Sequence, residues 1–97
     1  MLTSVHQKTF GDFYDSVRTN DILGPKTTYL LHPATAMAAG CVPCMEYYLK
    51  QKTVEGVTDE EIGTVQAIVM AVSAGKVNAQ LRQAERSVKA DRSTQGA

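Results

Sequence analysis

Net charge is the first property that this sequence lacks. Ten lysines and arginines are balanced by ten aspartates and glutamates. A protein that holds nucleic acid or an anionic membrane surface by general electrostatics needs a basic excess. We therefore expect neither nucleic acid nor a membrane among the partners. With 97 residues, the sequence has the length of one domain, which we expect to span residues 1–97.

Long apolar runs and strand patterns are missing as well. No stretch reaches the roughly 18 apolar residues of a membrane span, and the start of the chain shows no signal-peptide pattern. No segment alternates apolar and polar residues for long enough to predict a strand. Glycine-rich phosphate loops and nucleophilic serine motifs are also absent. These absences favour an all-α protein that resides in the cytoplasm.

Over most of the sequence, apolar residues recur with the helical period instead. They predict five helices, over residues 3–18, 26–39, 41–54, 58–75 and 77–92. We expect the fold to be all-α, a compact bundle of about five helices, followed by a frayed tail from residue 93. The apolar face of the first helix, expected to pack on the core, consists of Phe10, Phe13, Tyr14 and Val17. The corresponding face of the last helix consists of Val77, Leu81, Ala84 and Val88.

Proline, glycine and capping residues mark where these helices begin and end. Pro25 suits the first turn of a helix, whereas Pro33 removes a hydrogen bond inside it and is expected to kink it. Gly56 and Gly75 are natural helix ends. The segment from Thr58 to Glu61 has the pattern of a capping box, which explains its acidic residues better than an acid–base pair does.

The two cysteines are the most informative residues. Cys41 and Cys44 stand three positions apart and are the only cysteines in the chain. A disulfide that closes so small a loop would stabilise the fold by only about 2 kcal/mol through its constraint on the unfolded chain, so it would contribute little as a structural cross-link. Pro43 between them fits the first turn of a helix, whose free N–H groups favour a thiolate. The pattern therefore predicts a cysteine pair whose disulfide forms and breaks reversibly.

Other interpretations of the cysteines stay open. They could be two reduced, buried side chains at a helix junction, or metal ligands brought together across subunits. A zinc knuckle within one chain is disfavoured because His6 and His32 lie at no zinc-finger spacing. We expect no metal and no cofactor. His32 could lie near the cysteines, although its place before Pro33 is more typical of a local hydrogen-bond partner.

The block from residue 26 to residue 75 resembles the carboxymuconolactone decarboxylase/alkylhydroperoxidase D-like family. It combines an alanine-rich helix, the segment Gly40-Cys41-Val42-Pro43-Cys44, and the segment Gly56-Val57-Thr58-Asp59-Glu60-Glu61-Ile62. The resemblance implies an all-helical subunit that assembles as a homo-oligomer, often a trimer or hexamer. It also implies a CxxC pair that reduces peroxides or exchanges electrons with a thiol or disulfide partner. In that family the second cysteine attacks and the first resolves, which here are Cys44 and Cys41.

Two positions depart from the peroxidase branch of that family. The branch has a histidine four residues after the second cysteine and a glutamate twelve residues before the first; here Tyr48 and Tyr29 stand there. A tyrosine with an ordinary pKa near 10 is a poor base but can donate a hydrogen bond to a thiolate. The hypothesis is a thiol–disulfide oxidoreductase or weak peroxidase, with Cys41, Cys44 and Tyr48 as catalytic residues. The alternative is a non-catalytic helical assembly module that kept the fold and the cysteines.

Overall fold

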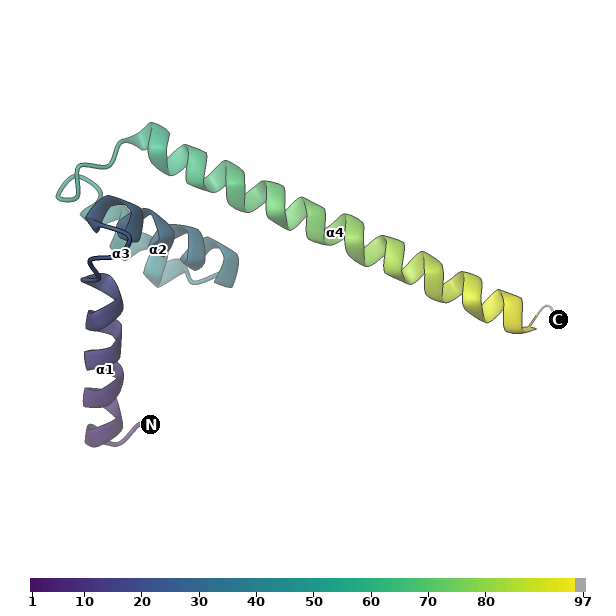
Figure 1. Cartoon of the computed structure of the whole chain (residues 1–97), viewed down its shortest axis with the longest axis horizontal. Helices are drawn as coiled ribbons and strands as arrows, with labels where there is room; N and C mark the ends of the chain where they lie inside the picture. Colours follow the sequence, from purple (N-terminus) through teal and green to yellow (C-terminus); the bar gives the residue numbers. More distant parts are fainter. Residues whose placement is uncertain (96–97) are drawn as a thin grey trace.

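Four helices make up the structure, a computed structural model that describes residues 1–95. They are α1 (Ser4–Arg18), α2 (Pro25–Ala39), α3 (Val42–Gln51) and α4 (Asp59–Gln95). No strand occurs within residues 1–95, so the predicted all-α class is confirmed. Helix α2 contacts α1, α3 and the first part of α4, and is the centre of the helical bundle (Figure 1).

The predicted helix boundaries are confirmed where turn chemistry sets them. Pro25 occupies the first turn of α2. Gly40 and Gly56 adopt left-handed backbone angles, with φ of 71° and 68°, that residues with a Cβ rarely adopt. Thr58 and Glu61 form the predicted capping box: the Glu61 amide donates to Thr58 Oγ1 at 3.1 Å, and the Thr58 amide donates to Glu61 Oε1 at 3.1 Å.

Two boundaries in the C-terminal part were predicted wrongly, which reduces five helices to four, and α3 ends at Gln51 rather than at residue 54. Gly75 lies inside α4 instead of ending a helix, and α4 continues to Gln95, through the first part of the predicted frayed tail. Residues 96–97 of that tail lie outside the described residues. A glycine within a helix costs only about 1 kcal/mol relative to alanine. Ala71, Ala74 and Ala79 near Gly75 favour the helix and offset that cost.

The buried core is small. The buried hydrophobic residues are Tyr29, Ala36, Tyr48 and Val57. The face of α1 that was expected to pack on the core is largely exposed, because α1 joins the bundle only through its C-terminal end (Figure 1). Phe10 and Phe13 remain 59% and 63% exposed, and only Tyr14 from that face reaches the bundle interior.

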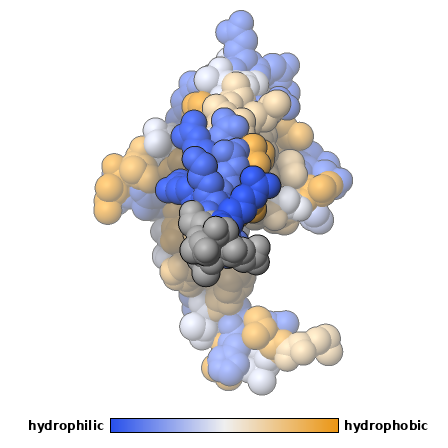
Figure 2. Space-filling view, turned by 90° about the vertical axis from the view of Figure 1, so that its right-hand side faces the viewer, coloured by the Kyte–Doolittle hydropathy of each residue, from blue (hydrophilic) through white to orange (hydrophobic). Residues whose placement is uncertain are grey.

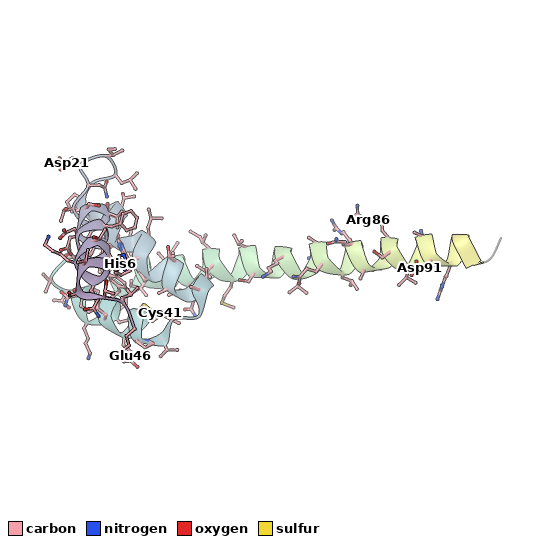
Figure 3. All side chains as sticks on the ribbon, turned by 90° about the horizontal axis from the view of Figure 1, so that it is seen from below. His6, Asp21, Cys41, Glu46, Arg86 and Asp91 are labelled. Atoms are coloured by element: carbon pink, nitrogen blue, oxygen red, sulfur yellow. A yellow bond between two sulfur atoms is a disulfide. The ribbon has the colours of Figure 1, made fainter. Side chains whose placement is uncertain are left out.

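Most of α4 extends away from the other helices (Figures 1 and 3). The radius of gyration is 20.0 Å, whereas a compact chain of this length has about 12–13 Å. In Figure 2 the coloured surface next to the grey atoms is hydrophilic, and hydrophobic surface is visible behind it. One exposed face of α4 has alternating spacings of four and three residues, the pattern of a coiled-coil seam. This α4 seam consists of Met70, Ala74, Val77, Leu81, Ala84 and Val88.

The continuity of α4 also bears on the expectation that no segment could span a membrane. Because two predicted helices are one, the part from Asp59 to Arg92 is long and apolar enough to cross a membrane, by length and composition only. No part of its most apolar window is buried inside the chain. Core helices of soluble proteins meet the same criterion, so this is weak evidence for a membrane span.

The exposed α4 seam predicts self-association. An apolar helix face of this kind is stabilised by a matching helix, and a second copy of the chain carries one. Light scattering coupled to gel filtration at micromolar concentration should give a mass well above the 10.5 kDa of one chain. A mass of one chain at all concentrations would contradict the prediction.

Matched lysine variants test whether the α4 seam is the contact. Val77→Lys combined with Leu81→Lys should lower the measured mass, because two ammonium groups would be placed against an apolar face. Ala79→Lys combined with Gln83→Lys adds the same charge on the opposite side of the helix and should leave the mass unchanged. Equal masses for the two double variants would exclude the α4 seam as the interface.

The capping box predicts a pH-dependent stability. The ion pair with Lys26, together with hydrogen bonds from Thr58, lowers the pKa of Glu61 from its ordinary value of 4.5. A lowered folded-state pKa gives stability that is complete above the unfolded pKa and is lost as the pH falls through the folded pKa. Glu61→Gln should therefore lower the melting temperature at pH 7, and the difference from the unmodified chain should shrink below about pH 4.

Glu60→Gln is the matched control for that measurement. It removes the same charge from the same helical turn, yet Glu60 has no ion-pair partner within residues 1–95. Thermal unfolding followed by circular dichroism at pH 3 to 7 should show the smaller effect for Glu60→Gln. A Glu61→Gln deficit that persists unchanged at pH 3 would contradict the proposed contribution of the ion pair.

Candidate functional site

Cys41 and Cys44 lie where the sequence placed them, at the start of α3. Cys41 is the N-cap residue and Cys44 is in the first turn, and the two are joined by a disulfide. The tight connection from α2 is fixed by the Cys41 amide, which donates to the Ala36 carbonyl at 2.9 Å across the left-handed Gly40. The α3 N-terminus is therefore held next to the end of α2.

The cysteines are partly accessible and oxidised. Both side chains are of intermediate exposure, which differs from the alternative of two reduced and fully buried thiols. Cys44 packs against the cluster of Tyr29, Tyr48 and Val57 that forms the centre of the core. Within the described residues no group of three or more His, Cys, Asp or Glu residues could hold a metal ion. The disulfide thus lies at the edge of the core, with one side open to solvent.

Tyr48 is buried directly behind Cys44 and is held from two other helices. Its hydroxyl forms a hydrogen bond with the hydroxyl of Tyr14 from α1. Its backbone carbonyl accepts a hydrogen bond from the hydroxyl of Tyr29 from α2. The Tyr29 and Tyr48 rings meet edge to face, with centroids 6.1 Å apart. The two positions that depart from the peroxidase branch are therefore neighbours in space, as a proton relay would require.

Burial sets the protonation of these two tyrosines. Removal from solvent raises the pKa of Tyr48 well above its ordinary value, and the hydrogen bond with Tyr14 raises it further. Burial, together with the nearby Glu55 carboxylate, raises the pKa of Tyr29 in the same direction. Both hydroxyls keep their protons at neutral pH. They act as hydrogen-bond donors and cannot act as general bases.

His32 makes the local hydrogen bond that its sequence position indicated. Its Nδ1–H donates to the carbonyl of Thr28 at 2.8 Å, because a carbonyl can only accept. The imidazole also packs on the Tyr48 ring, with centroids 4.9 Å apart. His6 lies at the exposed start of α1, 3.1 Å from Thr3 Oγ1, and takes no part in the site.

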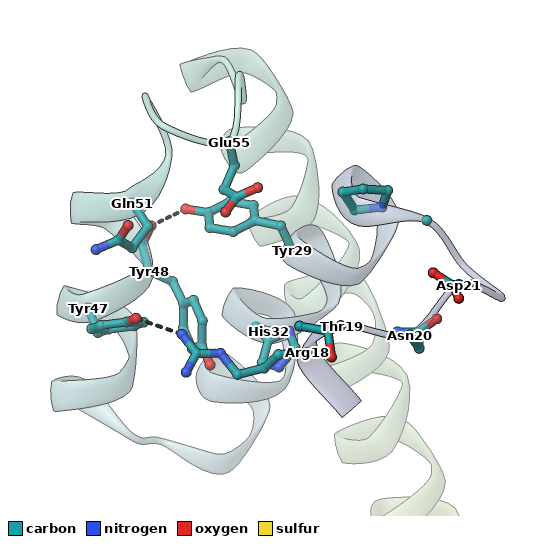
Figure 4. A pocket seen from close by; sticks show the side chains of 12 residues that line it. Arg18, Thr19, Asn20, Asp21, Tyr29, His32, Tyr47, Tyr48, Gln51 and Glu55 are labelled. Carbon is teal, nitrogen blue, oxygen red and sulfur yellow. Dashed lines mark hydrogen bonds between the residues drawn. The ribbon is translucent and has the colours of Figure 1, made fainter. Parts of the chain in front are cut away.

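Arg18 is a member of the site that the sequence did not reveal. Its Nη2 donates to the Tyr47 hydroxyl at 2.6 Å (Figure 4). Its guanidinium lies over the rings of Tyr14 and Tyr47, at 5.2 and 5.3 Å from the centroids. The hydrogen bond to Tyr47 raises the pKa of Arg18, which is fully cationic. The contact joins residues 29 positions apart, and no local motif indicates such a pair.

Two adjoining cavities share part of their lining, and the smaller one opens beside the disulfide. The smaller, of about 350 Å³, is here called the cysteine cavity and is lined by Tyr14, Arg18, Pro43, Cys44, Tyr47 and Tyr48. The larger, of about 460 Å³, shares Arg18, Tyr47 and Tyr48 with it and extends toward Asp21 and Glu55 (Figure 4). The chemistry available at this place is that of a sulfur at a helix N-terminus, with phenol donors and one guanidinium around it.

A comparison with known proteins identifies the family. The model of the carboxymuconolactone decarboxylase family matches residues 6–86, which include α2, α3, the disulfide and most of α4. No curated protein and no solved structure matched the chain. The family match covers most of the sequence and agrees with the cysteine pair and capping box from which the resemblance was drawn. The chain belongs to the carboxymuconolactone decarboxylase family.

Proposed function

We propose that this protein is a thiol–disulfide oxidoreductase that cycles the Cys41–Cys44 pair between dithiol and disulfide. The observation that carries the proposal is the position of the pair: a bridged CxxC at the N-terminus of α3, partly exposed and next to a cavity. Helix N-termini stabilise thiolates. The proposed partner is a small thiol or disulfide that exchanges electrons with the pair.

The proposed cycle begins with the dithiol form. The Cys44 thiolate attacks one sulfur of a substrate disulfide, the substrate S–S bond breaks, and the departing thiolate takes a proton from water. The Cys41 thiolate then attacks Cys44 Sγ in the mixed disulfide, releases the second substrate thiolate and closes the protein disulfide. Two electrons pass from the protein dithiol to the substrate disulfide. A reducing dithiol returns the protein to its starting state by the reverse exchange.

Tyr48 has a supporting role in this proposal. Its hydroxyl keeps its proton, and when the Tyr14 hydroxyl is the donor in the bond between them, Tyr48 can donate a hydrogen bond that stabilises the Cys44 thiolate once the disulfide opens. It cannot take the thiol proton, which a histidine at the same position could do. Peroxide reduction through a Cys44 sulfenic acid, with Cys41 releasing water as it closes the disulfide, is therefore proposed only as a slow side activity.

A second candidate function has an observation of its own. The exposed α4 seam runs from Met70 to Val88 and would suit a non-catalytic helical assembly module. Homo-oligomers are proposed under both functions, with a trimer or hexamer as the family resemblance implies. We further propose a cytoplasmic location, because a reducing compartment allows a CxxC pair to cycle. The two functions differ in whether the thiols turn over.

Trapping experiments test the proposed order of attack. In Cys41→Ser, a small disulfide should convert Cys44 into a stable mixed disulfide, because no resolving thiol remains. The unmodified reduced chain should instead close its own bridge and show no adduct. Intact mass after alkylation distinguishes the two. Cys44→Ser is the matched control and should form the adduct far more slowly at Cys41. Two free thiols in the unmodified chain after diamide treatment would contradict the cycle.

A histidine variant tests the position of Tyr48. Tyr48→His would place a base that titrates near neutral pH one helical turn after Cys44. The rate at which the reduced chain reacts with hydrogen peroxide at pH 7 should rise by about tenfold, within the low range for a positioned base. Adding Tyr29→Glu should raise it further, because a carboxylate would orient the imidazole.

The same substitution one residue later provides the control. Leu49→His introduces an identical side chain at an exposed position of α3 that lines neither cavity, and it should change the peroxide rate far less. Stopped-flow kinetics from pH 5 to pH 9 would measure both variants, with circular dichroism to verify the fold. Equal rates for Tyr48→His and the unmodified chain would show that residue 48 does not serve Cys44.

A further inference from the structure

The cysteine cavity contains a cation that nothing in the proposed cycle uses. We propose that Arg18 binds the carboxylate of the substrate, so that the cavity selects small organic disulfides that carry a carboxylate group. This inference rests on the proposed thiol–disulfide exchange and adds to it the chemical class of the substrate. It is carried by three observations: the unpaired charge of Arg18, the absence of acidic residues from the lining of the cavity, and its aromatic walls.

The guanidinium of Arg18 has no carboxylate partner within residues 1–95. The ion pairs found there are Lys8–Asp12, Lys26–Glu61 and Lys52–Asp59. Arg18 itself is partly buried and makes one hydrogen bond, to the Tyr47 hydroxyl. A guanidinium has five N–H donors in a planar fork that fits a carboxylate with two parallel hydrogen bonds. Most of these donors remain available.

The guanidinium is also held in place. It lies over the rings of Tyr14 and Tyr47, and the Tyr47 hydroxyl fixes its rotation. Such contacts restrict a side chain that otherwise loses much rotational freedom on binding a ligand. A positioned cation next to a reactive sulfur can orient a substrate that carries the opposite charge.

The lining of the cysteine cavity carries one charge, and it is positive. Among its lining residues, Arg18 is the one charged group, and the others are tyrosines, Pro43 and Cys44. The carboxylates in this part of the chain, Asp21 and Glu55, line the larger cavity instead. A carboxylate in the cysteine cavity would therefore meet the guanidinium without an acidic lining residue, and a cationic substrate would be repelled.

The walls and the size of the cavity suit a small organic molecule. Tyr14, Tyr47 and Tyr48 present ring surfaces to it, and these can pack on the hydrocarbon part of a substrate. The volume of about 350 Å³ is near the lower end of the range of about 300–1,000 Å³ for ligand pockets. Arg18 and Cys44 line the same cavity, so one molecule can place its carboxylate on the first and its disulfide against the second.

Three disulfides of similar length and different charge test the inference. They are dithiodipropionate, which is anionic, hydroxyethyl disulfide, which is neutral, and cystamine, which is cationic. Each oxidation rate of the reduced protein is divided by the rate of the same disulfide with dithiothreitol, which removes intrinsic differences in reactivity. We expect the normalised rate for the anion to exceed that for the neutral compound by roughly tenfold, as for a hydrogen bond to a charged group, and the cation to be slowest.

Charge-removing variants locate the effect. Arg18→Gln should reduce the ratio of anionic to neutral rates to about one, and any influence of Arg18 on Cys44 itself cancels in that ratio. Arg82→Gln removes the same charge from an exposed position on α4 and should leave the ratio unchanged. In the unmodified protein, added salt should lower the ratio as well, and this measurement does not depend on the folding of a variant.

Two results would overturn the inference: a ratio near one in the unmodified protein, or a tenfold ratio that survives in Arg18→Gln. If none of the disulfides reacted, the proposed exchange itself would fail, and binding would then decide the carboxylate site. Binding of phenylpropionate to the oxidised protein can be followed by the quenching of tyrosine fluorescence. We expect this quenching in the unmodified protein and not in Arg18→Gln. Binding that Arg18→Gln abolishes would support the site, and absence of binding, or equal binding by both proteins, would overturn it.

Discussion

The burial of Tyr48 is the constraint on which the rest of the structure depends. Its hydroxyl is tied to α1 through Tyr14, and its backbone carbonyl is tied to α2 through Tyr29. Because Tyr48 belongs to α3, these two bonds fix the cysteine-bearing helix against both neighbours. The core is small, so these two bonds and the backbone bond from Cys41 to Ala36 together keep the N-terminus of α3 in place. One residue therefore links the stability of the bundle to the placement of the disulfide.

The same burial changes the chemistry that the site can perform. A histidine and a carboxylate at these two positions would move protons, whereas two buried phenols hold theirs and can only donate hydrogen bonds. The helix N-terminus becomes the main stabiliser of a thiolate at Cys44. Such a site suits exchange between thiols better than attack on peroxide, because a thiolate leaves without a dedicated acid to protonate it, whereas the oxygen that leaves from a peroxide needs a proton. Tyrosines in place of the histidine and glutamate of the peroxidase branch thus favour thiol–disulfide exchange over peroxide reduction at this site.

The parts of the fold that depend on local chemistry could be predicted from the sequence. The capping box of Thr58 and Glu61, Pro25 in the first turn of α2 and the cysteines at a helix start are each set by a few neighbouring residues. Gly75 was misjudged because a glycine ends a helix only when the chain turns there, and the surrounding alanines continue it. The contacts of Arg18 with Tyr47 and of Tyr14 with Tyr48 join distant segments, so no spacing in the sequence could indicate them.

The central claim is that the Cys41–Cys44 bridge opens and closes under cellular conditions, and the reduction potential of this pair tests it most directly. Equilibration with glutathione redox buffers, followed by alkylation and mass measurement, gives the value. The account predicts a potential between about −200 and −280 mV, near the cytosolic glutathione poise, because a bridge over so short a loop gives little stability to the fold. A potential below about −300 mV, typical of structural disulfides, or thiols that do not oxidise in any of the buffers, would contradict it.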